Sequence, residues 1–214
     1  FFGNAYVQYA TDLADNQKLT LKYQLGTDSY TSNYTDLWGY GHSNQKGSID
    51  NYHISFTELN SLATAMYNWK INDDLIFDAM IGNEIINSSS RYDFARGLNF
   101  NFPGWNNMNN ASSFTASQEL RNKRTFGTFA SASLAYKNML FLNATGRNDI
   151  VSSMPRNNRS FFYPSISAGF VFTELEALKG NHILSFGKLR ASYAEVGQAG
   201  DYVDSYYTIP TFTG

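Results

Sequence analysis

The stretch from Gly146 to Glu174 reads GRNDIVSSMPRNNRSFFYPSISAGFVFTE and predicts two antiparallel strands joined by a polar connection. The first segment ends in polar residues that include Arg147 and Asp149. The second segment alternates and places on one face the apolar residues Ile166, Ala168, Phe170 and Phe172. Because successive side chains of a strand point to opposite faces, the stretch predicts part of a β-sheet wall with one apolar and one polar side.

The composition of the chain excludes several classes of protein. The 214 residues suffice for one large domain, and a formal net charge of −2 gives no electrostatic case for nucleic-acid binding. Charged residues make up 16%, against roughly 25% in soluble domains, and aromatic residues also make up 16%. No run approaches the ~18 apolar residues of a membrane-spanning helix, which excludes a helical membrane protein but leaves a transmembrane β-barrel. The absence of cysteine excludes disulfides and thiolate metal sites.

Period-2 alternation recurs along the chain and predicts eight or nine strands, most of them about 10–13 residues long. This length exceeds the ~5–6 residues of globular strands and suits the ~9–11 residues that cross a membrane. The expected strands are Asn4–Leu13, Leu19–Tyr30, Tyr52–Ile71, Leu75–Asn87, Arg124–Tyr136, Leu140–Ile150, Phe161–Thr173 and Ser185–Val196, with a weaker one within Tyr202–Thr208.

Tight and long connections alternate between these strands. Asn and Asp residues supply turn geometry in the tight connections, which lie at Asp15, Asn72 and Lys137. The long connections are rich in Asn, Ser, Gly and aromatic residues and span Thr31–Asn51, Ser88–Lys123 and Ser152–Ser160. An up-and-down sheet collects all tight turns at one end, as outer-membrane barrels do with their short periplasmic turns.

Aromatic residues gather at the end of the strands where the tight turns are expected. Tyr67 and Trp69 precede the Asn72 turn, Tyr136 precedes Lys137, and Phe170 and Phe172 precede Glu174. Amphipathic rings favour the headgroup level of a membrane, so this placement favours an aromatic girdle. The alternative is that these rings cap the core of a soluble β-sandwich.

The alternation also assigns each strand a lipid side and an inner side. A Lys or Arg facing lipid at mid-membrane costs ~2–4 kcal/mol, so the charged side is the inner one. The lipid side is expected to carry Leu140, Leu142, Ala144, Phe162, Ile166, Ala168, Phe170, Phe172, Leu189, Ala191 and Tyr193. The inner side is expected to carry Asp78, Glu84, Asn143, Thr145, Arg147, Asp149, Tyr163, Ser165, Ser167, Gly169, Lys188, Arg190 and Ser192. Phe129 and Phe141 break this pattern and are expected to pack against something inside the lumen.

No motif for catalysis, cofactor binding or metal binding is present, so we expect neither an enzyme nor a cofactor. His42, His53 and His182 are far apart and lack metal-ligand spacing. Trp38, Tyr40 and Trp105 lie in expected long loops, where they either stack on sugar or peptide or pack loop on loop. Arg147 and Asp149 either bind ligand or an internal plug, or form a structural ion pair.

Four stretches in order resemble SusC/RagA-type TonB-dependent outer-membrane transporters. The first is Gly3–Tyr9 followed by Leu19–Lys22 and Leu25-Gly26. Gly146–Asp149 with Ser152-Ser153 resembles the R-A-D-G-S-S-R-F strand end of the family, from which Asn148, Ile150 and Met154-Pro155 depart. Phe161–Ala168 resembles its F-P-S-V-S-A strand. Lys188–Tyr193 with Val196–Gln198 resembles K-L-R-A-S-Y-G-x-x-G-N, with Ala194 in place of Gly.

The resemblance implies an antiparallel up-and-down barrel of about 22 strands that holds an N-terminal plug, of which residues 1–214 form a partial wall of the β-barrel domain. It implies a multi-pass protein of the bacterial outer membrane that imports oligosaccharide or peptide. The implied partners are a SusD-like surface lipoprotein, TonB acting through the plug, the rest of the barrel and membrane lipid. Neither plug, TonB-contacting motif nor signal peptide is recognised in this sequence. Such a wall has open edges and is not expected to insert into a membrane alone.

The residues expected to face the lumen or the substrate are Arg147, Asp149, Tyr163, Arg190, Asp78, Trp38, Tyr40 and Trp105. Two alternatives to the importer remain open at this point. One is a small, closed outer-membrane barrel that serves as an adhesin or structural protein. The other is a soluble carbohydrate-binding β-sandwich.

Overall fold

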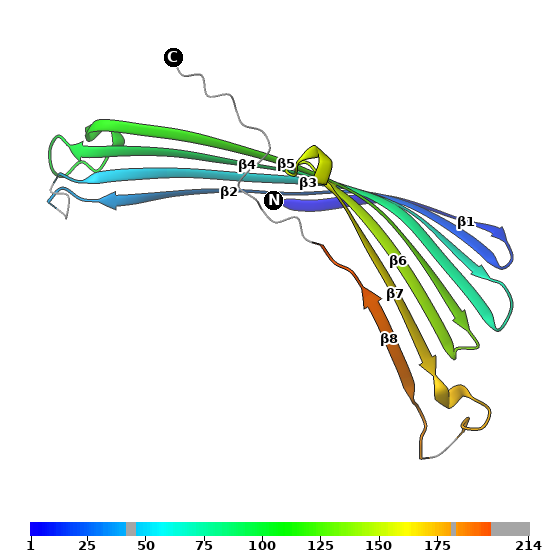
Figure 1. Cartoon of the computed structure of the whole chain (residues 1–214). Helices are drawn as coiled ribbons and strands as arrows, with labels where there is room; N and C mark the ends of the chain where they lie inside the picture. The colour runs from blue at the N-terminus through cyan, green and yellow to red at the C-terminus, as the bar shows by residue number, and fades with distance from the viewer. Residues whose placement is uncertain (42–45, 181–182, 198–214) are drawn as a thin grey trace. The chain divides into compact units, whose positions relative to one another are not determined.

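A single eight-stranded sheet, in which every strand is hydrogen-bonded to the next one along the chain, forms the fold (Figure 1). The computed structural model describes residues 1–41, 46–180 and 183–197. The strands are β1 Phe2–Ala14, β2 Gln17–Trp38, β3 Ser48–Lys70, β4 Leu75–Phe100, β5 Ala111–Tyr136, β6 Leu140–Val151, β7 Ser160–Val171 and β8 Lys188–Ala194. Short 3₁₀ turns are η1 Met108–Asn110, η2 Arg156–Asn158 and η3 Phe172–Glu174.

The up-and-down all-β architecture is thereby confirmed. The soluble sandwich is wrong, because a sandwich needs two sheets packed face to face. Strand order runs from β1 to β8, with no pairing of β8 back onto β1 within the described residues, which argues against a closed small barrel. The strand expected within Tyr202–Thr208 lies outside the described residues. None of the described helices is long and apolar enough to cross a membrane.

Two of the expected long loops are wrong, because strands occupy most of them. β2 continues to Trp38 and β3 begins at Ser48, so only residues 39–47 connect them. Likewise β4 continues to Phe100 and β5 begins at Ala111. The extensions of β2 and β4 alternate polar with aromatic side chains and that of β5 is mostly polar, so all three lack the continuous apolar side by which a strand is usually recognised. The third long connection, between β6 and β7, is confirmed.

The chain divides into two compact units, and β2 to β5 contribute to both. Unit 1 comprises Phe1–Gly3, Gly26–Leu59 and Asn87–Lys123. Unit 2 comprises Asn4–Leu25, Asn60–Ile86 and the described part of Arg124–Gly214.

In unit 2, the pairing of β5 to β8 aligns residues of like chemistry across the strands. One row pairs Ala132 with Ala144, Ala144 with Ile166 and Ile166 with Tyr193. The neighbouring row on the opposite face pairs Ser133, Asn143, Ser167 and Ser192 in the same order. The strand order and register therefore confirm the two sides predicted for β6, β7 and β8.

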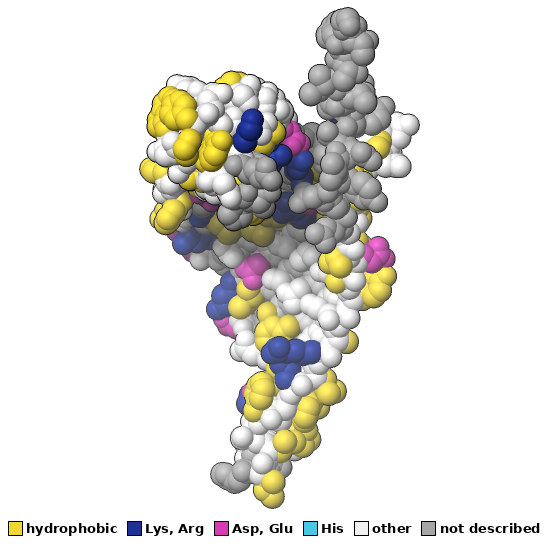
Figure 2. Space-filling view, turned by 90° about the vertical axis from the view of Figure 1, so that its left-hand side faces the viewer, with side chains coloured by type: hydrophobic (Ala, Val, Ile, Leu, Met, Phe, Trp, Pro, Cys, Tyr) yellow, Lys and Arg dark blue, Asp and Glu magenta, His cyan; other side chains and the backbone are white. Residues whose placement is uncertain are grey.

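The apolar side of unit 2 is uncovered in this chain. Ile166 is 61% exposed, Leu189 64% and Tyr193 61%, and Figure 2 shows many hydrophobic side chains open at the surface. Contiguous exposed apolar surface of this kind marks a membrane or protein interface. Phe172 was expected on the lipid side, but it is the first residue of η3 rather than part of β7. Its ring packs against Gly187, where a Cβ would lie 2.1 Å from it.

The tight turns of unit 2 lie next to one another. Lys70 donates its backbone N–H to the carbonyl of Asn16 at 2.9 Å, which joins the first turn region to the second. Lys137 donates its N–H to the carbonyl of Asp74 at 2.7 Å, which joins the second to the third. Lys137 and Asn138 both have positive φ, 51° and 54°, as the two central residues of a type I′ turn require, and Met139 donates its N–H to the carbonyl of Tyr136 at 2.9 Å. The predicted collection of tight turns at one end of the sheet is confirmed.

Unit 1 has a small core at the far ends of β3 to β5. Ile49, Phe100 and Ala111 are buried there, with Met108 packed against them. Gly47, at a φ of +81°, lets the Phe100 ring approach to where a Cβ would lie 2.6 Å away. Asn110 Nδ2 donates to the carbonyls of Phe102 and Trp105, both at 2.8 Å, which closes the connection between β4 and β5. The strand extensions are therefore anchored by packing at their tips.

Two neighbouring substitutions test the assignment of sides. Ile166→Lys places a charge on the apolar side and is expected to destabilise the whole protein in lipid by about 2–4 kcal/mol near the membrane midplane. Ser167→Lys, the next residue along β7, places the same charge on the polar side and is expected to cost much less. Urea unfolding of the whole protein in lipid vesicles measures both. Equal losses would contradict the assignment.

Candidate functional site

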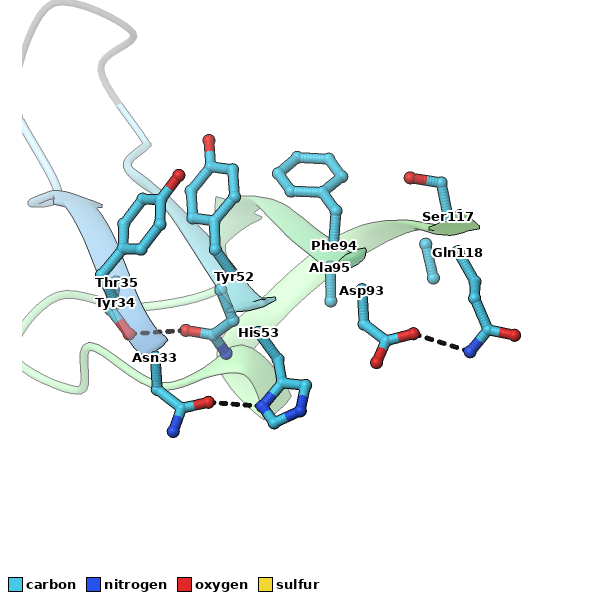
Figure 3. A pocket seen from close by; sticks show the side chains of 12 residues that line it. Asn33, Tyr34, Thr35, Tyr52, His53, Asp93, Phe94, Ala95, Ser117 and Gln118 are labelled. Atoms are coloured by element: carbon cyan, nitrogen blue, oxygen red, sulfur yellow. Dashed lines mark hydrogen bonds between the residues drawn. The ribbon is translucent and has the colours of Figure 1, made fainter. Parts of the chain in front are cut away.

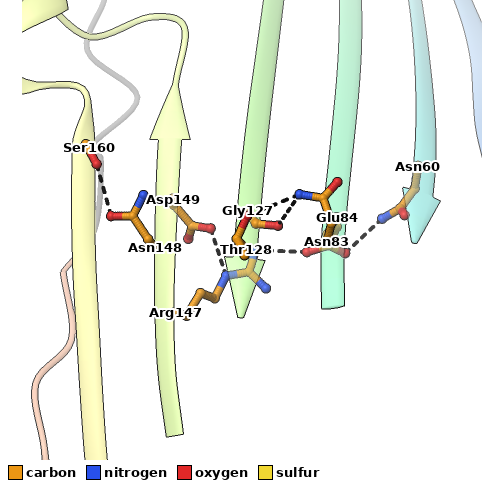
Figure 4. A network of polar contacts seen from close by, with 9 residues as sticks. All are labelled: Asn60, Asn83, Glu84, Gly127, Thr128, Arg147, Asn148, Asp149 and Ser160. Carbon is orange, nitrogen blue, oxygen red and sulfur yellow. Dashed lines mark hydrogen bonds and ion pairs between the residues drawn. The ribbon is translucent and has the colours of Figure 1, made fainter. Parts of the chain in front are cut away.

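The polar side of unit 2 carries an ion network centred on Arg147 of β6 (Figure 4). Its Nη2 donates to Glu84 Oε2 on β4 at 2.8 Å, and its Nε donates to Asp149 Oδ1 at 2.8 Å. Glu84 also accepts a hydrogen bond from Asn60 Nδ2 on β3 at 3.1 Å. One guanidinium thus joins β6 to β4 and, through Glu84, to β3.

Glycines make room for this network to cross β5. A Cβ on Gly127 would lie 2.5 Å from Asp149 Oδ1 and 2.6 Å from Arg147 Nη2. The ring of Phe129 lies 5.7 Å below the Arg147 guanidinium carbon, a cation–π distance. The tip of this ring lies against Gly82, where a Cβ would meet it at 2.3 Å. Phe129, which breaks the predicted alternation, therefore packs against the Arg147 guanidinium within the network.

The other predicted inner residues of unit 2 lie on the same side. Tyr163 pairs with Arg147 across β6 and β7, and Arg190 pairs with Gly169 across β7 and β8. Asp78 accepts hydrogen bonds from Asn68 at 2.6 Å and Ser133 at 3.4 Å. Phe141, the second pattern-breaking residue, lies 4.5 Å below the ammonium of Lys188.

The predicted loop aromatics belong to unit 1 and do not join the network. Trp38 is the last residue of β2, and Tyr40 lies in the connection that follows it. Trp105 stacks on Phe102, with ring centroids 5.8 Å apart and planes 12° apart. Phe102 and Trp105 lie in the same connection, and the Trp105 ring is still 44% exposed.

A row of aromatic side chains on β2, β3 and β4 of unit 1 was missed by the sequence analysis. We call Tyr30, Tyr34, Tyr52, Phe56, Tyr92 and Phe94 the aromatic row. Tyr34 stacks on Tyr52 with centroids 4.2 Å apart, and Tyr52 lies 5.0 Å from Phe94 and 6.2 Å from Tyr92. Tyr30 stacks on Phe56 at 5.3 Å. A signal was present, because these residues alternate along the chain, but Tyr34, Tyr92 and Phe94 fall in segments expected to be long loops.

An ion pair closes one end of the aromatic row. Arg96 donates to both carboxylate oxygens of Asp50, at 2.8 and 2.6 Å, and its guanidinium carbon lies 5.3 Å above the Phe94 ring. Tyr52 also donates its hydroxyl to Asp50 at 3.5 Å. The hydrogen bond from Arg96 lowers the pKa of Asp50, against the effect of burial, which raises it.

The opposite side of the same strands is polar. Figure 3 shows Tyr34, Tyr52 and Phe94 pointing one way, and Asn33, His53 and Asp93 pointing the other. His53 Nδ1 shares a hydrogen bond with Asn33 Oδ1 at 2.6 Å, and Gln118 donates to Asp93 at 2.6 Å. These side chains border a hollow of about 630 Å³. No group of three His, Asp or Glu side chains in the described residues is placed to hold a metal ion.

Removal of Arg147 tests whether the network is structural. Arg147→Ala leaves the carboxylates of Glu84 and Asp149 without their cation. Because the paired side chains remain 35%, 21% and 17% accessible, we expect a loss of about 1–3 kcal/mol rather than the 3–5 kcal/mol of fully buried pairs.

The triple variant Arg147→Met, Glu84→Gln, Asp149→Asn removes the charges together and is expected to recover most of that loss. Urea unfolding of the whole protein in vesicles measures both variants. Undiminished stability of Arg147→Ala together with reduced transport would instead assign the arginine to cargo.

Acidification tests the Asp50–Arg96 pair. A carboxyl whose pKa is lower in the folded than in the unfolded state stabilises the fold above the unfolded pKa of about 3.9, and this stabilisation is lost as the pH falls through the folded pKa. Amide hydrogen exchange near Asp50, corrected for the intrinsic rate, should therefore accelerate below about pH 4. In Asp50→Asn it should be fast already at neutral pH, and unchanged exchange in that variant would contradict the role of the pair.

Comparison with known proteins places this two-sided sheet in a family. A family model described as TonB dependent receptor-like, beta-barrel, matches residues 2–214. TonB-dependent receptor P26 of Formosa agariphila is 28% identical over 130 residues, which are 60% of this chain and 12% of that protein.

Solved structures share the fold. The RagAB peptide transporter has a TM-score of 0.73 at 17% identity over 89% of this chain and 22% of that chain. The RagAB peptide importer in the closed-closed state has a TM-score of 0.71 at 20% identity over 90% of this chain and 22% of that chain.

These matches bear out the SusC/RagA-type resemblance, and they show that the chain spans a minor part of its relatives. Since the family model covers nearly the whole sequence, this chain belongs to the family of TonB-dependent receptor β-barrels.

Proposed function

We propose that the protein containing this chain imports a nutrient, oligosaccharide or peptide, across the outer membrane. TonB-dependent receptors are transport proteins rather than enzymes, and their barrels lie in the outer membrane. In this proposal unit 2 forms part of the membrane wall, and its polar side lines the passage.

The observation that carries the proposal is the contrast between the two sides of unit 2. One side presents open apolar residues such as Ile166 and Leu189, and the other presents the Arg147 network. A hollow of about 540 Å³ lies against Val7, Leu21, Ala63 and Ile81 of the described chain, a lining suited to lipid chains. A wall between lipid and an aqueous lumen needs this distribution, because lipid-exposed charges are costly.

Strand length supports a second part of the proposal, that unit 1 lies outside the membrane. β4 and β5 have 26 residues each, whereas about 9–11 cross the hydrocarbon layer. If the tight turns are periplasmic, as in other outer-membrane barrels, the surplus residues project on the extracellular side. The polar hollow beside His53 then faces water rather than lipid.

The partners follow from the family resemblance and are proposals for the whole protein. A plug inside the barrel would contact TonB and draw on the energy of the inner membrane. A SusD-like surface lipoprotein would cover the extracellular opening. The RagAB proteins of similar fold are peptide importers, which supports peptide beside oligosaccharide as a class of cargo.

Energy-dependent uptake tests the proposed function. Cells that produce the whole protein should accumulate labelled oligosaccharides or peptides that a deletion strain does not take up. A protonophore or loss of TonB should abolish the difference, because the energy comes from the inner membrane. Fractionation should place the protein in the outer membrane. Uptake that persists without TonB, or an inner-membrane location, would overturn the proposal.

A further inference from the structure

The aromatic row of unit 1 adjoins a polar hollow on the same side of the strands. The hollow measures about 250 Å³ and is lined by Ile54, Ser90, Tyr92, Glu119 and Arg121. Tyr92 belongs to both the aromatic row and the hollow, and Ser90 and Tyr92 are two residues apart on β4, so they lie on the same side of the strand. Rings, a hydroxyl and an ion pair are thereby combined on one surface.

The rings of the row pack against one another and remain partly exposed to solvent. Tyr30 is 53% and Tyr34 46% exposed, while Tyr52, Phe56, Tyr92 and Phe94 are half-buried. Within residues 1–41, 46–180 and 183–197, the hydroxyls of Tyr34 and Tyr92 make no hydrogen bond, so they are available to a ligand. A ring face carries negative charge density that attracts polarised C–H groups, which cover the faces of sugar rings.

The charged side chains beside the row carry a net negative charge. Arg96 is bound to Asp50, and Arg121 is bound to Glu119. Asp36 adds a carboxylate close enough to Tyr52 to raise the pKa of its hydroxyl. A ligand with carboxylates or sulfates would meet these acidic groups with both arginines already engaged, whereas the hydroxyls of a neutral glycan would donate to the carboxylates.

A peptide main chain has little to pair with on the β3 and β4 part of the row. Both strands are hydrogen-bonded to a neighbour on each side, so their backbone groups are used within the sheet, whereas β2 is paired with β1 as far as Ser29. Peptide capture by strand addition needs a free sheet edge. The part of the row on β3 and β4 therefore offers only side chains.

On these grounds we propose that the aromatic row is a cargo-binding surface that stacks on the rings of an uncharged glycan. This inference rests on the proposed function and narrows it to one class of cargo.

Paired substitutions on alternate residues test the proposal. The purified whole protein is applied to an array of neutral oligosaccharides with glucan, xylan, mannan and galactan backbones, together with uronate-containing and sulfated counterparts and short peptides. We expect binding to neutral members. The variant Tyr34→Ala, Tyr52→Ala should weaken this binding about tenfold or more, a loss of about 1.4 kcal/mol or more.

The control is Asn33→Ala, His53→Ala, which changes the adjacent residues on the opposite side of the same strands. It should leave binding unchanged, and heat-dependent gel mobility checks that both variants fold. Binding to acidic glycans or peptides alone, or equal binding by the row variant and the control, would overturn the inference. TonB-dependent uptake in cells, measured alongside, shows separately whether the proposed transport function holds.

Discussion

Every residue of an extended strand faces one of two sides, and the structure depends on giving these sides opposite chemistry. In unit 2 the alternation separates apolar residues such as Ile166 from polar neighbours such as Ser167. A shift of one residue in pairing would turn each of them to the other side, so the contrast itself fixes the register. The tight turn at Lys137-Asn138 adds a local constraint, since both residues adopt positive φ.

The network around Arg147 depends on that register. Glu84 lies 63 residues away in sequence, and it reaches the guanidinium because β4, β5 and β6 pair in order. On the intervening strand β5, Gly127 leaves room for the ion pair to cross, and Gly82 on β4 leaves room for the ring of Phe129. A larger residue at Gly127 would push against Asp149 and Arg147, and one at Gly82 would displace the Phe129 ring.

Sequence reasoning succeeded where one side of a strand is continuously apolar. For β6 to β8, apolar residues such as Leu142, Ala168 and Leu189 identify the apolar side even when the pairing of the strands is unknown. It failed for the extensions of β2 to β5, because Asn33 and Tyr34 alternate polar with aromatic, a composition shared with loops. The Arg147–Asp149 pair was predictable from a spacing of two residues. Its link to Glu84 was not, since that requires the pairing of strands distant in sequence.

Strands β2 to β5 extend beyond the length of a membrane span, and this affects how their surfaces can evolve. Side chains on a paired sheet are ordered before a ligand arrives, so binding there costs little conformational entropy compared with binding to loops. Because the sides alternate, a substitution at Tyr52 alters one surface and a substitution at His53 the other. The chemistry of the two surfaces can then diverge independently, residue by residue, along one continuous strand.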